Sequence, residues 1–402
     1  MNDVFPRTLS AALAGSLAIV TAGVVARKSA FYRAQLQATP GRGLPLDGLR
    51  GLMAWSVFIH HTDIARQWLR TGTWSCDSGL ILFLGKGAVL VFFMITGFLF
   101  WGKAVAAQGR LAPLPLWLGR LRRLAPLYAL SAVLILVATA GAWLAAPGPT
   151  RSAFLVRLFS LGIVDWSRLP GYKIITANGG VQWSLWYEWR FYLALPLLAW
   201  FACSRRRMVI LFGLGLVALP LTDITSDTTV YWLAFLPGIA AVYLQRSTAL
   251  RNALCTPASA GAAVAWCVLV LALSHFGGCG WSLLAVVPLF WTVAAGNSYF
   301  GALIHPATRL LGTISYSVYL LHAILLMAIL KVLGNVIDLA LLPLPAYCCL
   351  VAGIGVFLTL VCALTYRWVE HPFLVWRTPW ERSKPTLPVR AIQQQEVRLA
   401  EG

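Results

Sequence analysis

Long apolar stretches recur along almost the whole chain, and polar residues cluster in the short segments between them. About 20 apolar residues are needed for a helix to cross a bilayer, and eleven stretches approach or reach that length. They lie at about 9–26, 46–63, 79–101, 124–146, 190–203, 207–222, 229–244, 259–275, 280–296, 313–333 and 347–369. This pattern predicts an all-α, polytopic integral membrane protein with about 11 transmembrane helices.

The composition supports the same class. Only 11% of the 402 residues are charged and 59% are hydrophobic, whereas soluble domains carry about 25% charged residues. The eight cysteines are scattered and show no CxxC spacing, so we expect neither a metal site nor a disulfide framework.

The net charge of +19 raises the question of nucleic acid, and the distribution of the charge answers it. If the N-terminus is outside, the loops on the cytoplasmic side hold 19 Lys and Arg residues and the opposite loops hold 7. Cytoplasmic loops of membrane proteins show this excess. We therefore predict an N-out, C-in orientation and no nucleic-acid partner.

The chain divides into three parts on this reading. Residues 1–43 are expected to form an extra N-terminal transmembrane helix and a basic linker, which is retained because the basic residues follow the apolar run instead of preceding it. Residues 44–376 form the membrane core. Residues 377–402 are polar and rich in proline, and we expect a flexible cytoplasmic tail.

One predicted helix carries charge where lipid would penalise it. Arg50, His60 and His61 lie within an otherwise apolar stretch, and ionisable groups inside a membrane usually face a cavity or a partner. Arg50 and His61 are eleven residues apart, which is three turns and about 16 Å along a helix. They therefore share a face, with Arg50 near the cytoplasmic surface. The alternative is that Arg50 reaches the interface and His61 bonds a neighbouring carbonyl.

Six segments, in this order, resemble the motifs of the membrane-bound acyltransferase-3 family. They are LDGLRGLMAWSVFIHH (46–61), LVFFMITGFLF (90–100), GRLRRLAPLY (119–128), WSLWYEWRFYLALPLL (183–198), LGTISYSVYLLHAILL (311–326) and YRWVEHPF (366–373). The first has the arginine, the ten intervening residues and the histidine of the family's first motif. One position departs from the pattern in a way that matters: Trp189 stands where the family has a second carboxylate, so a role that needs two adjacent carboxylates is in doubt.

The resemblance implies a ten-helix acyltransferase core, to which this chain adds one N-terminal helix. It also implies an O-acyltransferase of the bacterial inner membrane that uses cytoplasmic acyl-CoA, most often acetyl-CoA. The acceptor would be a hydroxyl of an envelope carbohydrate, such as lipopolysaccharide O-antigen or exopolysaccharide. The expected partners are therefore acyl-CoA, a carbohydrate or lipid-linked glycan, and membrane lipid.

Acyl transfer to a hydroxyl needs a base, and histidine is suited to that because its ordinary pKa is near 6.5. The resemblance makes His61 the predicted base, with His60 as the alternative. Glu188 is the carboxylate best suited to orient an imidazole. CoA is polyanionic, so its site needs fixed positive charge. Arg50, Arg120 and Arg123 are the candidates on the predicted cytoplasmic side.

The remaining candidates are substrate contacts. Ser315, Tyr319 and His322 occupy positions i, i+4 and i+7, so they share one helical face. Trp183 lies near the predicted outer interface, where aromatic residues are common in any case. Packing is the alternative for Tyr319 and His322, and membership of the interfacial aromatic belt is the alternative for Trp183. At the level of function, the alternatives are acylation of a small molecule or a lipid, and a transporter or flippase without acyl chemistry.

Overall fold

The structure, a computed structural model, describes residues 4–38, 44–164, 175–204, 206–207, 209–210, 226–275 and 278–376. Every regular element in these ranges is helical, which confirms the predicted all-α class. The α-helices are α1 (Val4–Lys28), α2 (Ala30–Gln37), α3 (Leu44–Thr71), α4 (Gly79–Ala106), α5 (Pro113–Ala138), α6 (Ala140–Ala145), α7 (Gly148–Leu158), α8 (Ile175–Asn178), α9 (Trp183–Ala199), α11 (Asp227–Leu233), α12 (Phe235–Leu244), α13 (Thr248–Leu254), α14 (Pro257–Leu273), α15 (Cys279–Ala295), α16 (Pro306–Thr313), α17 (Ser315–Leu333), α18 (Leu344–Thr365) and α19 (His371–Val375). Shorter helical segments are η1 (Trp200–Cys203), η3 (Ala302–Ile304), η4 (Leu339–Leu341) and η5 (Tyr366–Glu370).

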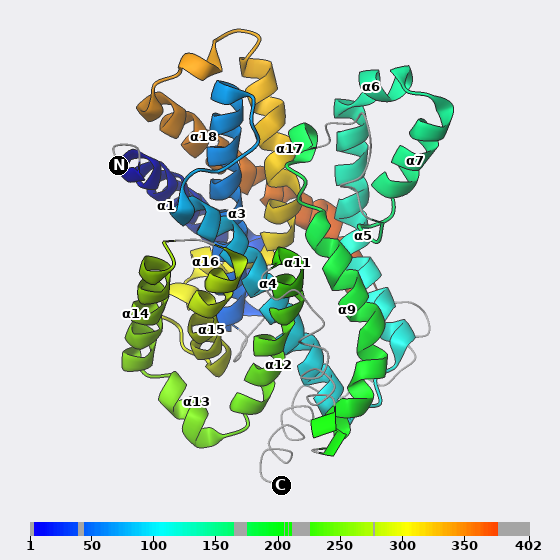
Figure 1. The fold of residues 1–402 in the computed structure, drawn as a ribbon, viewed down its shortest axis with the longest axis vertical. Coiled ribbons are helices and arrows are strands. Elements are labelled where there is room, and N and C mark those ends of the chain that lie inside the picture. The colour runs from blue at the N-terminus through cyan, green and yellow to red at the C-terminus, as the bar shows by residue number, and fades with distance from the viewer. Residues whose placement is uncertain are drawn as a thin grey trace.

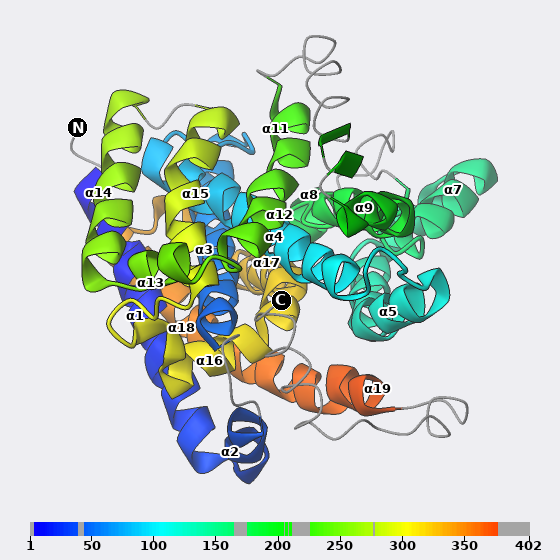
Figure 2. The same ribbon diagram turned by 90° about the horizontal axis from the view of Figure 1, so that it is seen from below.

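Helices α3 and α17 occupy the centre of the molecule (Figure 1). Helices α5 and α9 lie to one side of them and α1 and α14 to the other, and the view from below shows the same order (Figure 2). Helix α3 packs against α4, α16 and α17, and α4 packs in turn against α9 and α12. The first motif helix is therefore enclosed by protein.

Ten of the eleven predicted stretches coincide with helices, and the eleventh, 207–222, lies largely outside the described residues. Within the described part of the chain, five helices are long and apolar enough to cross a membrane, or up to seven if two bent pairs each form one span. The protein is therefore a multi-pass membrane protein. The count of eleven helices and the N-out orientation remain predictions.

Glycines let the central helices approach closely. A Cβ on Gly312 of α16 would lie 1.9 Å from the backbone oxygen of Asp47 on α3, and one on Gly48 would lie 2.0 Å from the oxygen of Leu303. A Cβ on Gly51 would lie 2.5 Å from the backbone nitrogen of Gly312. Such close backbone contact is how helices associate where no hydrophobic effect drives them together. The glycines that flank Arg50 in the first motif therefore bring α3 close to η3 and α16.

The extra N-terminal helix is part of the helical assembly. Helix α1 packs along α18 and α16. Its contact face is a row of buried alanines spaced four residues apart, namely Ala14, Ala18, Ala22 and Ala26. Residues four apart lie on one face of a helix, so this row gives α1 a narrow seam of small side chains.

Two helices start earlier than the hydropathy pattern indicates. Helix α9 begins at Trp183 instead of 190, and α5 begins at Pro113 instead of 124. In both cases the added turns carry polar side chains, including Glu188 and Arg120, that line an internal cavity. Averaged hydropathy falls in such turns although the side chains do not face lipid, so the pattern placed the starts of these helices too late.

Candidate functional site

A cavity of ≈ 260 Å³ lies between α3, α4, α5, α9 and α17. We call it the cationic cavity, because four basic side chains line it and only one acidic one does. The basic residues are Arg50, Lys103, Arg120 and Arg123, and the acidic residue is Glu188. Five of the eight residues singled out from the sequence therefore meet here: Arg50, Arg120, Arg123, Glu188 and Tyr319.

Arg120 and Arg123 of the third motif lie on one face of α5 but have different surroundings. The Arg120 guanidinium lies over the Phe100 ring, 4.7 Å from its centroid, and 5.7 Å from the Tyr192 centroid. Lys103 lies over the same Phe100 ring, at 5.0 Å. Cations over an aromatic face are attracted by its quadrupole. Arg120 and Lys103 thus form a basic pair around one aromatic ring at the α4–α5 end of the cavity.

Sequence reasoning missed Lys103. It follows the apolar run of α4, so it counted only as one of the cytoplasmic positive charges. The available signal was its position beside Phe100 in the second motif segment, combined with a motif arginine on the next helix. Only the tertiary structure, which brings Arg120 of α5 over Phe100 of α4, makes that combination meaningful.

Arg123 is engaged with a carboxylate. Its guanidinium nitrogen lies 3.2 Å from Glu370 Oε2, and the Glu370 side chain is fully buried. Ser317 donates a hydrogen bond to the other carboxylate oxygen of Glu370, and Thr365 donates to Ser317 at 3.0 Å. Segments from three motifs therefore meet in one buried network, which balances the charge of Arg123.

Glu188 faces the cavity and is held by its own helix. Tyr192, one turn later on α9, donates its hydroxyl proton to Glu188 Oε2 at 2.7 Å. The sequence analysis expected Glu188 to orient the catalytic imidazole. The structure instead gives this carboxylate a tyrosine partner, and a histidine contacts His61.

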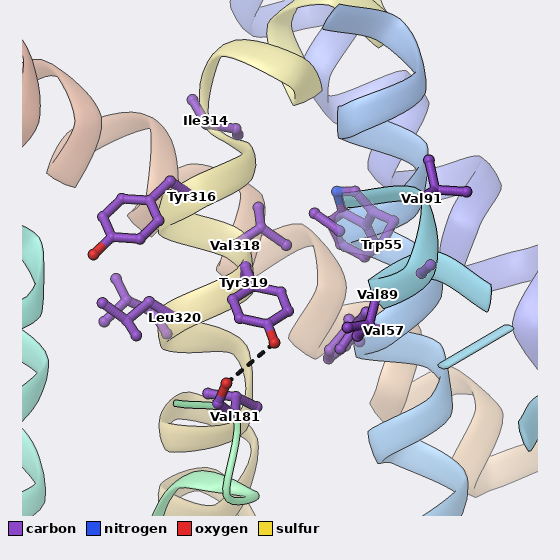
Figure 3. Close-up of a cluster of buried hydrophobic side chains, with 14 of the residues drawn as sticks. Trp55, Val57, Val89, Val91, Val181, Ile314, Tyr316, Val318, Tyr319 and Leu320 are labelled. Atoms are coloured by element: carbon purple, nitrogen blue, oxygen red, sulfur yellow. Dashed lines mark hydrogen bonds between the residues drawn. The ribbon is translucent and has the colours of Figure 1, made fainter. Parts of the chain in front are cut away.

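Tyr319 closes one end of the cavity. Its hydroxyl donates to the Val181 carbonyl at 3.1 Å and accepts from Ser184, whose oxygen lies 2.7 Å away. Figure 3 shows this bond to Val181 and shows Tyr319 pointing between α17 and the helices that carry Trp55 and Val89, while Tyr316 points to the other side of α17. These bonds connect α17 to Val181 and Ser184 at the start of α9.

His61 and His322 form what we call the histidine pair on the far side of Tyr319. His322 Nε2 lies 3.1 Å from His61 Nδ1, and the ring centroids of Tyr319 and His322 are 6.3 Å apart. His322 is fully buried and His61 is half-buried. His61 does not line the cationic cavity, so the predicted base and the predicted donor site are neighbours instead of one chamber.

His60 and Trp183 lie elsewhere. The His60 ring is bonded to the Ile81 carbonyl at 3.1 Å and lies against Gly85, where an added Cβ would come within 2.5 Å of it. The Trp183 ring lies 4.6 Å from the Tyr231 centroid, within an aromatic cluster. Neither residue lines the cationic cavity, and the predicted substrate contact by Trp183 stays untested.

Among the described residues, no group of three His, Cys, Asp or Glu side chains is arranged to hold a metal ion. The site combines a cavity lined mostly by basic charge with a neighbouring pair of imidazoles.

A comparison with known proteins identifies the family of this chain. The searches of curated proteins and of solved structures returned no match. Residues 45–367 match the sequence model of a family whose description is acyltransferase domain. That range includes the lining residues of the cationic cavity and both members of the histidine pair. The chain therefore belongs to the membrane-bound acyltransferase-3 family.

Proposed function

We propose that this protein transfers an acyl group, most commonly acetyl, from acyl-CoA to a hydroxyl of an envelope carbohydrate in the bacterial inner membrane. The observation that carries the proposal is the position of the cationic cavity next to the histidine pair. The cavity offers fixed positive charge for a polyanionic acyl donor. The histidine pair offers a base for the acceptor hydroxyl.

The shape and charge of the cavity support acyl-CoA as the donor. Its volume of ≈ 260 Å³ is below the roughly 300–1,000 Å³ of most small-molecule sites, so it fits the narrow pantetheine arm better than the whole cofactor. Arg120 and Lys103 lie at the α4–α5 end, which the sequence predicts to be cytoplasmic. They would hold the phosphates outside the cavity, while the acyl group points toward Tyr319.

The chemistry assigned to the histidine pair is general-base catalysis. His61 removes the proton of the acceptor hydroxyl as the oxygen attacks the thioester carbonyl carbon. The carbon–sulfur bond then breaks, and the CoA thiolate takes up the proton from the His61 imidazolium. Arg50 lines the cavity on the same helix as His61 but lies about 16 Å along that helix from it, so it would hold an anionic part of the donor.

Glu188 has a smaller role in this proposal than the sequence implied. Its carboxylate is bonded to Tyr192 and it is the acidic residue among the cavity-lining side chains. It would offset part of the positive charge of the cavity.

The test is transfer of labelled acetyl from acetyl-CoA into envelope glycan by inside-out membrane vesicles. We expect protein-dependent labelling that falls by about 10²–10⁴-fold in His61→Ala, the usual contribution of a general base. His60→Ala is the matched control, because the His60 ring is bonded to a backbone carbonyl of α4. Label that survives in His61→Ala but is lost in His60→Ala would move the base to His60.

Two other results would redirect the proposal. Label that appears in the lipid or small-molecule fraction would keep the enzyme and change its acceptor. An absence of protein-dependent label in every fraction would favour a transporter without acyl chemistry.

A further inference from the structure

Two histidines from distant parts of the chain meet between the central helices. His61 lies on α3 and His322 on α17, 261 residues later, and His322 is fully buried. A buried imidazole costs free energy unless its nitrogens find partners, and both nitrogens of His322 have one in this structure. The fold therefore satisfies both nitrogens of this buried imidazole, and the hydrogen-bond pattern determines where the protons lie.

The backbone fixes the proton of His322. Its Nδ1 lies 2.9 Å from the carbonyl oxygen of Val318, one turn earlier on α17. A carbonyl can only accept, so Nδ1 carries the hydrogen, and in a neutral imidazole the other nitrogen is then an acceptor. His322 consequently presents a bare Nε2 lone pair to His61.

The same reasoning fixes the proton of His61. Its Nδ1 faces two acceptors, the Val57 carbonyl at 3.0 Å and His322 Nε2 at 3.1 Å. That nitrogen must carry the hydrogen and share it between them. In neutral His61 the unprotonated nitrogen is therefore Nε2, the one that can take a proton from a substrate.

The Nε2 edge of His61 lies beside a glycine. A Cβ built on Gly179 would lie 3.2 Å from His61 Nε2, and Gly179 has a φ of +65°, a conformation that favours glycine. A side chain at this position would crowd Nε2, so the glycine leaves only backbone beside this nitrogen.

We propose that His322 is a positioning residue that holds His61 in the tautomer with a bare Nε2 and accepts its Nδ1 hydrogen bond as His61 becomes imidazolium. This inference rests on the proposed function, in which His61 is the base. His322 thus takes the place that Glu188 was expected to fill, with a neutral acceptor in an environment where a carboxylate would be costly. It does not itself touch the reacting atoms.

The kinetic test compares His322→Gln with His322→Leu in the labelled-acetyl assay. The glutamine amide oxygen can replace the lost acceptor, whereas leucine fills a similar volume without one. We expect His322→Leu to lower kcat about 100-fold with KM for acetyl-CoA unchanged, and His322→Gln to stay within about 10-fold of the unmodified protein. A residue with only a packing role would show the opposite preference, since leucine packs well between apolar helices.

Equal loss in both variants, or an active His322→Leu, would overturn the proposal. The unmodified protein and His61→Ala are assayed alongside. If the unmodified protein transfers no acyl group, the proposed function fails. If it is active and His61→Ala is not, while His322→Leu retains its rate, only the positioning role fails.

A second measurement needs neither activity nor a variant at position 322. The whole chain has six histidines, so the ring nitrogen-15 spectrum of the labelled protein is simple, and His61→Ala identifies the His61 signals. We expect a protonated Nδ1 and a bare Nε2 for His61 in the neutral state. A His61 signal pattern with the proton on Nε2 would refute the proposed tautomer.

Discussion

Replacement of Arg123 by methionine should destabilise the folded protein far more than replacement of its neighbour Arg122. Arg123 lies 3.2 Å from a carboxylate oxygen of Glu370, and the two side chains are 15% and 0% exposed. With an effective dielectric constant of about 20, two unit charges at this distance attract by roughly 5 kcal/mol. Removing one partner of a buried pair typically costs about 3–5 kcal/mol because the other charge is left without compensation.

The measurement is the free energy of unfolding of the purified protein in mixed micelles. We expect a loss of about 3–5 kcal/mol for Arg123→Met and less than about 1 kcal/mol for Arg122→Met, because Arg122 lies over the half-exposed Trp376 ring. The double variant Arg123→Met with Glu370→Gln removes both charges and leaves an amide that still accepts the Ser317 hydrogen bond. It should therefore be more stable than Arg123→Met alone.

Two results would contradict this reasoning. A cost for Arg123→Met that is no larger than that for Arg122→Met would mean that the ion pair contributes little. A double variant whose loss equals the sum of the two single losses would mean that the charges do not interact, so Arg123 would be better explained as a ligand-binding residue alone.

Three further variants test other parts of the site. Arg120→Met should raise KM for acetyl-CoA about 10-fold with kcat nearly unchanged, because one charge-assisted contact to a phosphate is lost. Steady-state kinetics at two salt concentrations measure this change. An unchanged KM would show that Arg120 does not contact the donor. Gly312→Ala should lower the free energy of unfolding by at least about 1–3 kcal/mol, because the new Cβ would lie 1.9 Å from the Asp47 oxygen. The matched control Gly353→Ala, which has nothing within 4 Å of its new Cβ, should be close to neutral in the same unfolding experiment. Tyr319→Phe should cost about 1–2 kcal/mol in unfolding, because its two hydrogen bonds at the end of the cavity are lost; a neutral result would mean that these bonds do not stabilise the fold.

The helical class and most helix positions could be predicted from the long apolar stretches, and the six motif segments identified the family that the sequence comparison confirms. The starts of α5 and α9 could not be predicted, because hydropathy does not distinguish a polar residue that faces lipid from one that faces a cavity. Helix α3 shows the same limitation of hydropathy. It is too polar to be among the five helices whose composition would let them cross a membrane, yet other helices enclose it.

The sequence by itself determined which residues share a face of a single helix. It placed Arg50 and His61 on one side of α3, and Tyr319 and His322 on one side of α17. It did so because helical periodicity is a local property of the backbone.

Only the tertiary structure decided which of these faces meet. It separates Arg123, which is paired with Glu370, from Arg120, which lies with Lys103 over Phe100. It also brings His322 to His61. Such partnerships depend on how closely and at what height neighbouring helices pack, and that spacing is set by backbone contacts at positions such as Gly312. Residues hundreds of positions apart set that packing jointly, so no local pattern in the sequence encodes it.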